Sequence, residues 1–139
     1  MNRKNLKKID TIKEDEIKNT VIDVAKVLRD GKAFDIKILD LRRLTTLTDY
    51  FIICTATSTI QIKALVREIE EFLFPKKIKL LNSVDSFNTP WVLLDFNFFV
   101  VHIFLKEGRD FYQLERLWAD ADEVIFEINR DKNIKREIS

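Results

Sequence analysis

Two strongly apolar segments lie only three residues apart in the second half of the chain, and this spacing limits the possible folds. The segments are residues 91–95 and 99–104. Three residues are too few for a helix, so the segments are predicted to be antiparallel strands joined in a hairpin. Between them, Asn97 is the residue best able to adopt the positive φ angle that such a turn requires.

Other stretches of the chain predict the remaining elements. Residues 50–54 are apolar without alternation, which is typical of a central strand covered on both faces. Residues 34–41 begin with alternating apolar and polar side chains and predict a strand with one wetter face. Residues 77–81 are a further short strand candidate. Apolar spacing predicts helices at residues 14–29, 59–74 and 109–118, and a short one at 123–129.

The order of these elements implies a mixed sheet, because a hairpin combined with a helical crossover requires both parallel and antiparallel strand pairs. We therefore expect an α/β (α+β) fold with a single mixed β-sheet of about five strands flanked by helices. The chain is divided into a basic N-terminal segment at residues 1–13, one domain at 14–122, and a C-terminal helical extension with a charged tail at 123–139.

Composition excludes several classes of protein. Lys and Arg number 24 against 23 Asp and Glu, and a net charge of +1 gives no global field to attract nucleic acid. A protein partner is therefore the better first hypothesis. Cys54 is the only cysteine, so no internal disulfide forms, and a reducing compartment is expected. We find no secretory signal and no apolar run of transmembrane length, so we expect a cytoplasmic protein without membrane contact.

The residues that carry chemistry in enzymes are sparse in this chain. His102 is the only histidine and lies in an apolar strand, so we expect it to be a hydrogen-bonded structural residue. Asp49 and Asp95 are isolated, whereas nucleotidyl transfer needs paired carboxylates that hold magnesium. Gly31 and Gly108 are the only glycines, and neither belongs to a phosphate-binding loop. We expect no catalysis, no metal and no cofactor.

Three stretches of the chain together resemble the ribosome-silencing factor (RsfS/Iojap) family. The first is TDYFIICTATS at residues 48–58, where Ala56 replaces the usual glycine. The second is WVLLD at residues 91–95 followed by VVHIF at 100–104, and the third is RDFYQLERLW at 109–118. The resemblance covers roughly residues 16–120. One departure is the hairpin turn, where Asn97 and Phe98 stand in place of the family's usual Gly-Asp.

The resemblance implies both a fold and a function. The fold would have a nucleotidyltransferase-like topology without the enzyme's chemistry. The protein would bind the large ribosomal subunit through a ribosomal protein of the L-fourteen family. It would sterically block association with the small subunit and so repress translation under nutrient limitation. Organellar relatives imply the alternative of a large-subunit assembly factor. Family members also form dimers in isolation, so a homodimer of the free protein is a further expectation.

Several residues are candidates for contact with a partner. Trp91 opens a strand and is either a core residue or an interface anchor, and the resemblance favours the anchor. Arg109, Tyr112 and Glu115 occupy neighbouring helical positions, where Tyr112 could offer its ring while the two charged residues bind the partner or pair locally. Phe98 either marks an apolar docking patch or folds back onto the sheet. A second stripe of the same predicted helix suits the core: Phe111, Leu114 and Trp118.

Polar residues at the ends of the central strand are secondary candidates. Asp49, Thr57 and Ser58 flank residues 50–54, and strand ends in α/β folds often form a ligand crevice. Capping and turn formation would explain Thr57 and Ser58 equally well. The basic N-terminal segment and the basic residues of the tail are expected to make auxiliary contacts with ribosomal RNA, which would weaken steeply with salt.

Overall fold

The structure, a computed structural model, describes residues 3–127, with side chains from residue 13 onward. Its elements follow in chain order: α1 (Arg3–Asp30), β1 (Phe34–Asp40), β2 (Tyr50–Ala56), α2 (Thr59–Leu73), the 3-10 turn η1 (Phe74–Lys76), β3 (Trp91–Asp95), β4 (Phe99–Leu105), α3 (Lys106–Tyr112), α4 (Leu114–Leu117) and β5 (Asp122–Val124). The predicted mixed α/β fold is confirmed.

The five strands form one sheet in the order β3-β4-β2-β1-β5. β2 and β4 run parallel, and the other neighbouring pairs are antiparallel. The chain path explains this arrangement. α2 returns the chain to the end of the sheet where β2 begins, residues 77–90 carry it back along the outer edge of β3, and the β3–β4 hairpin then reverses it, so that β4 runs parallel to β2. The predicted β3–β4 hairpin is confirmed, and Asn97 has the expected positive φ of 76°.

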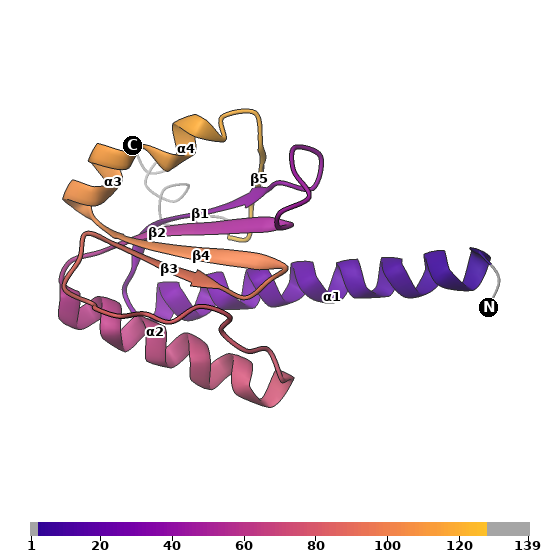
Figure 1. Ribbon diagram of the computed structural model, residues 1–139, viewed down its shortest axis with the longest axis horizontal. Helices are drawn as coiled ribbons and strands as arrows, with labels where there is room; N and C mark the ends of the chain where they lie inside the picture. Colours follow the sequence, from indigo (N-terminus) through magenta and orange to yellow (C-terminus); the bar gives the residue numbers. More distant parts are fainter. Residues whose placement is uncertain (1–2, 128–139) are drawn as a thin grey trace, which may run out of the picture.

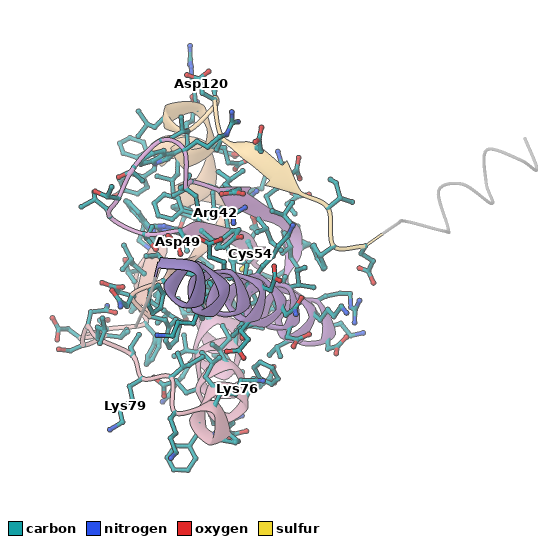
Figure 2. All side chains as sticks on the ribbon, turned by 90° about the vertical axis from the view of Figure 1, so that its right-hand side faces the viewer. Arg42, Asp49, Cys54, Lys76, Lys79 and Asp120 are labelled. Carbon is teal, nitrogen blue, oxygen red and sulfur yellow. The ribbon has the colours of Figure 1, made fainter. Side chains whose placement is uncertain are left out.

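One face of the sheet is fully covered by α1 and α2, which lie together on the same side (Figure 1). Successive strand residues point to opposite faces, so Ile52, Cys54, Val101 and Ile103 all face these helices. The apolar stripe of α2 is buried against them and includes Ile62, Leu65, Val66, Ile69 and Leu73. Figure 2 shows Cys54 between α1 and the sheet. This core supplies most of the hydrophobic stabilisation of the fold.

The opposite face of the sheet is covered only in part. α3 and α4 lie there, on the far side of the sheet from α1 and α2 (Figure 1). Leu114 of α4 and the following Trp118 pack on Leu39 of β1 and on Phe51 and Ile53 of β2. Among residues 3–127, no helix packs over the centre of the half formed by β3 and β4, where Leu93 is exposed, and this half provides the candidate site.

The outer edge of β3 is occupied by the segment that precedes it. Asn82 donates from Nδ2 to the Leu93 carbonyl at 2.9 Å and accepts at Oδ1 from the Asp95 amide at 2.8 Å. The Leu81 amide also donates to the Asp95 carbonyl at 2.8 Å. Asn82 therefore satisfies strand groups that a neighbouring strand would otherwise pair with, and it protects the edge against association with another chain.

The predicted strand at residues 77–81 is wrong. Lys77 has a left-handed φ of 60°, and Ile78 donates back to the carbonyl of Leu73, so the segment leaves η1 in a turn and does not become a strand of the sheet. The fifth strand is instead β5, which pairs antiparallel with β1. The predicted helix at 123–129 is therefore also wrong where the structure describes it. Its last two residues, and the basic tail to Ser139, lie outside the described residues.

The predicted single helix at 109–118 is wrong as well. Gln113 has a left-handed φ of 47°, which divides the segment into α3 and α4. The break changes the direction of the chain so that Leu114 of α4 packs on the face of the sheet opposite α1 and α2. At the other end of the chain, α1 begins at Arg3 and passes through the proposed boundary at residue 13 without interruption. The division of the chain at residues 13 and 122 stays a prediction.

Candidate protein-binding face

Four large side chains form what we call the aromatic patch on the open half of the sheet: Trp91, Leu93, Phe111 and Tyr112. Trp91 is half-buried at the start of β3, and its ring lies 4.8 Å from that of Tyr112 between centroids. Phe111 meets Tyr112 edge-on at 5.0 Å. Tyr112 is 42% exposed and Phe111 is 79% exposed. Such a cluster of accessible rings is typical of a surface that binds another protein.

His102 lies beneath the patch and holds Trp91 in place. The indole Nε1 of Trp91 donates to Nδ1 of His102 at 3.1 Å, and Phe104 stacks on the indole at 5.2 Å between centroids. Burial lowers the pKa of His102 to about 3, so the imidazole is neutral near pH 7. The expectation of a hydrogen-bonded structural histidine is confirmed, because His102 fixes the orientation of the tryptophan.

A hollow of about 330 Å³ adjoins the patch on the same face of the sheet. Its apolar lining comes from three strands, the loop after β1 and the loop after α4: Leu41, Leu47, Phe51, Leu93, Val100 and Trp118. Its polar lining includes His102, Asp95 and the two threonines Thr45 and Thr48. The patch and the hollow thus form a continuous surface around Leu93.

Arg109 and Glu115 form a structural ion pair rather than a free charged surface. Arg109 is only 12% exposed in its side chain, and its Nε donates to Glu115 Oε1 at 2.7 Å. Its Nη1 donates to the Asp35 carbonyl at 2.6 Å and to Thr55 Oγ1 at 2.8 Å. Burial alone would raise the pKa of Glu115, but hydrogen bonds from Arg109 and Lys37 outweigh it and lower that pKa. The pair fastens α3 to α4 and to the sheet.

Asp49 and Phe98 lie at the opposite end of the β3–β4 hairpin from Trp91. The Asp49 amide donates to the Phe98 carbonyl at 3.0 Å. Burial raises the pKa of the Asp49 carboxyl, while the nearby Arg42 opposes this shift. Figure 2 shows Asp49 and Arg42 on the same side of α1. Phe98 is 51% exposed and lines a second hollow against α1, so it is separate from the aromatic patch.

Thr57 and Ser58 cap α2. Ser58 Oγ accepts from the Gln61 amide at 3.1 Å, which is the N-cap interaction of the helix. Thr57 donates from its amide and from Oγ1 to Oε1 of Gln61, at 2.7 and 2.9 Å. Both side chains are exposed, but their contacts within the chain are those of a helix terminus.

Sequence reasoning misses Leu93 and misplaces Phe111. Leu93 lies two residues after Trp91 in a strand, so its position on the same face could have been found from the period of two. Phe111 is exposed, although the periodicity predicts a core position, because the break at Gln113 changes which side of the segment is buried. Which of all these residues contact a partner stays a prediction.

Neither a metal centre nor a membrane span is found in the part of the chain that the structure describes. Among the side chains of residues 13–127, no three His, Cys, Asp or Glu are grouped as metal ligands. No described helix is both long and apolar enough to cross a membrane. The fold and the site define a small mixed α/β protein with an exposed aromatic face, which is the kind of surface that binds other proteins.

Comparison with known proteins assigns the family. Residues 14–138 match the family model described as "Ribosomal silencing factor during starvation", so the chain belongs to the ribosomal silencing factor family. The chain is 38% identical over 92 residues to ribosomal silencing factor RsfS of Bacillus subtilis. The aligned region covers 66% of this chain and 78% of that protein. The chain is 42% identical over 106 residues to the chloroplastic protein Iojap of Zea mays, covering 74% of this chain but only 45% of that longer protein.

Solved structures support the same fold. A crystal structure of a protein from Chromobacterium violaceum matches with a TM-score of 0.65 and 31% identity, covering 83% of this chain and 92% of that one. A second, from Bacillus halodurans, matches with a TM-score of 0.64 and 27% identity, covering 80% and 98%. The mixed sheet with its flanking helices is therefore an arrangement that relatives share.

Proposed function

We propose that this protein represses translation under nutrient limitation by binding the large ribosomal subunit and sterically blocking its association with the small subunit. The proposed contact on the subunit is a ribosomal protein of the L-fourteen family, and the proposed place of action is the cytoplasm. Membership of the ribosomal silencing factor family supports this function. The observation that carries it is the aromatic patch, where the accessible rings of Trp91, Tyr112 and Phe111 lie against one another on one face of the sheet.

The composition of the patch suits a protein partner better than RNA. Tyr and Trp are enriched among the residues that dominate binding free energy, because each buries a large ring and keeps one polar atom for a hydrogen bond. Trp91 and Tyr112 are the proposed anchors, and Leu93 and Phe111 extend the apolar area around them. The near-zero net charge gives little long-range attraction to phosphate.

Steric occlusion requires no bond chemistry, and we propose that the protein is not an enzyme. The ion pair of Arg109 and Glu115 then has a positioning role, since it holds the helix that carries Tyr112. The remaining candidates are proposed as peripheral contacts: Asp49, Thr57, Ser58 and Phe98. A homodimer of the free protein through the aromatic patch is also proposed, and it would compete with binding to the ribosome.

The test is co-sedimentation with purified large subunits, followed by a subunit-joining assay. Trp91→Ala should weaken binding by about tenfold or more and restore joining, because truncating a central aromatic anchor typically costs above 1 kcal/mol. Phe74→Ala is the matched control, since Phe74 is an aromatic residue that is 82% exposed at the end of α2, away from the patch. It should bind like the wild type. Equal binding by a folded Trp91→Ala variant would refute the proposed surface.

Silencing and assembly are distinguished by what accumulates in cells without the protein. Loss of a silencing factor leaves mature large subunits that join small subunits freely during starvation. Loss of an assembly factor, the alternative function, leaves immature large subunits even in rich medium. Sucrose-gradient profiles of ribosomal particles from both growth conditions separate the two outcomes.

A further inference from the structure

One nitrogen of His102 is buried without a hydrogen-bond partner. The side chain of His102 is almost fully enclosed, and its Nε2 has no hydrogen-bond partner among the described residues. The other ring nitrogen, Nδ1, accepts from Trp91 Nε1 at 3.1 Å. An indole N–H can only donate, so Nδ1 carries the lone pair and the single proton of the neutral imidazole lies on Nε2. The part of the chain that the structure describes therefore buries this N–H donor without supplying an acceptor for it.

Two aromatic rings pack against the imidazole. The Phe51 ring lies 4.4 Å from it between centroids at an angle of 73°, and Phe104 lies 6.4 Å away. An aromatic ring is at best a weak acceptor and does not replace a carbonyl oxygen. Buried polar side-chain atoms in native proteins nearly always have a partner, so each exception needs an explanation.

The orphan donor borders the hollow next to the aromatic patch. His102 lines this hollow together with Phe51, Leu93 and Trp118, whereas Trp91 is not part of the lining. The Nδ1 edge of the ring is turned toward Trp91, so the opposite edge, which includes Nε2, is the one available to face the hollow. The hollow is open at its rim, where Leu47 is exposed.

We infer that the hollow receives a hydrogen-bond acceptor of the protein partner, an oxygen of a main-chain carbonyl or of a side chain, which accepts from Nε2–H of His102. This inference rests on the proposed function and adds a specific contact to it. Nε2 is enclosed in the free chain, so the proposed hydrogen bond requires side chains around it to move when the partner binds. The aromatic patch provides apolar contact area, and the histidine selects a partner with an oxygen at one position.

The physical reason for such selection is an asymmetry in desolvation. The free protein already bears the cost of an unpaired buried donor, so a partner that supplies the acceptor gains a full hydrogen bond without stripping water from Nε2. A partner that lacks the acceptor gains no such hydrogen bond, because Nε2–H stays unpaired in an interface from which water is excluded. An unpaired polar group discriminates strongly between otherwise similar binding partners.

The first experiment observes the donor directly. His102 is the only histidine, so full-length protein labelled with [¹⁵N]histidine gives one imidazole signal. It is titrated with the purified L-fourteen ribosomal protein of the same organism, and calorimetry reports complex formation independently. The Hε2 proton should shift downfield and become protected from exchange with water. A complex that forms with an unchanged Hε2 signal would overturn the inference alone, and failure to form any complex would overturn the proposed function as well.

The second experiment uses a pair of variants. His102→Phe preserves a ring of similar size but removes the donor, and it should weaken binding by about tenfold. His102→Gln retains an N–H donor at a similar distance from the backbone and an oxygen for Trp91, so it should recover most of the affinity. Circular dichroism confirms that both variants fold. If the Phe and Gln variants bind equally, the donor has no role in recognition.

Discussion

Lowering the pH below 6.5 should destabilise the fold through one side chain. The pKa of His102 is about 3 in the folded protein because burial disfavours the charged imidazolium, whereas an unfolded chain has a histidine pKa near 6.5. Between these two values the unfolded state binds a proton that the folded state does not bind. The contribution to stability is therefore fully present above about pH 6.5 and is lost as the pH falls toward 3.

The magnitude follows from the size of the pKa difference. Each pH unit inside this window changes the free energy of unfolding by about 1.4 kcal/mol per proton, so the loss reaches about 2 kcal/mol at pH 5. Carboxylates also titrate in acid, and the pKa of Asp40 is lowered, chiefly by its hydrogen bond from Arg42. Comparison with His102→Phe removes these shared contributions, because both proteins contain the same carboxylates.

Urea denaturation at pH 7, 6, 5 and 4 measures this effect. The His102→Phe variant loses the acceptor for Trp91, which changes its stability by an amount that does not depend on pH. The difference in unfolding free energy between wild type and variant should therefore drift by about 2 kcal/mol in favour of the variant from pH 7 to pH 5. Parallel pH profiles would show that the imidazole takes up its proton in the folded state, and the burial argument would be refuted.

Three further predictions concern the supports of the face. Asn82→Ala should lower the free energy of unfolding in urea by about 1–2 kcal/mol, because it leaves groups on the β3 edge unpaired; an unchanged midpoint would contradict this. Arg109→Met should lower it by about 1–3 kcal/mol through loss of the charge-assisted bond to Glu115, and the pair is dispensable if Arg109→Met is as stable as the wild type. Gly108→Ala should lower the melting temperature measured by circular dichroism, because a Cβ there would lie 2.3 Å from the Pro90 carbonyl oxygen; an equal melting temperature would show that the backbone can shift freely.

Much of the fold follows from short-range patterns in the sequence. The apolar runs at 50–54, 91–95 and 99–104 become β2, β3 and β4, and the three-residue gap becomes the turn at Asn97. The apolar spacing of 59–74 becomes α2, with Ser58 as its cap. These features depend on a period of two or of about 3.6 residues and on local hydrogen bonds, which neighbouring residues determine among themselves. Trp91 and Tyr112 were selected by the family resemblance rather than by periodicity, and their contact with a partner stays a prediction.

Local patterns and motifs were therefore enough to predict the strand hairpin, the central strand, α2 and the likeness to the ribosomal silencing factors. Three other features became known from the three-dimensional fold: the fifth strand is β5, Gln113 breaks the last helix, and Arg109 is enclosed by Asp35, Thr55 and Glu115. The fold likewise shows that, among the described residues, half of one sheet face is uncovered and Nε2 of His102 has no hydrogen-bond partner. These features depend on contacts between residues that are distant in the chain. Such contacts override local conformational preference, and they produce no regular spacing of apolar residues that could be recognised in the sequence.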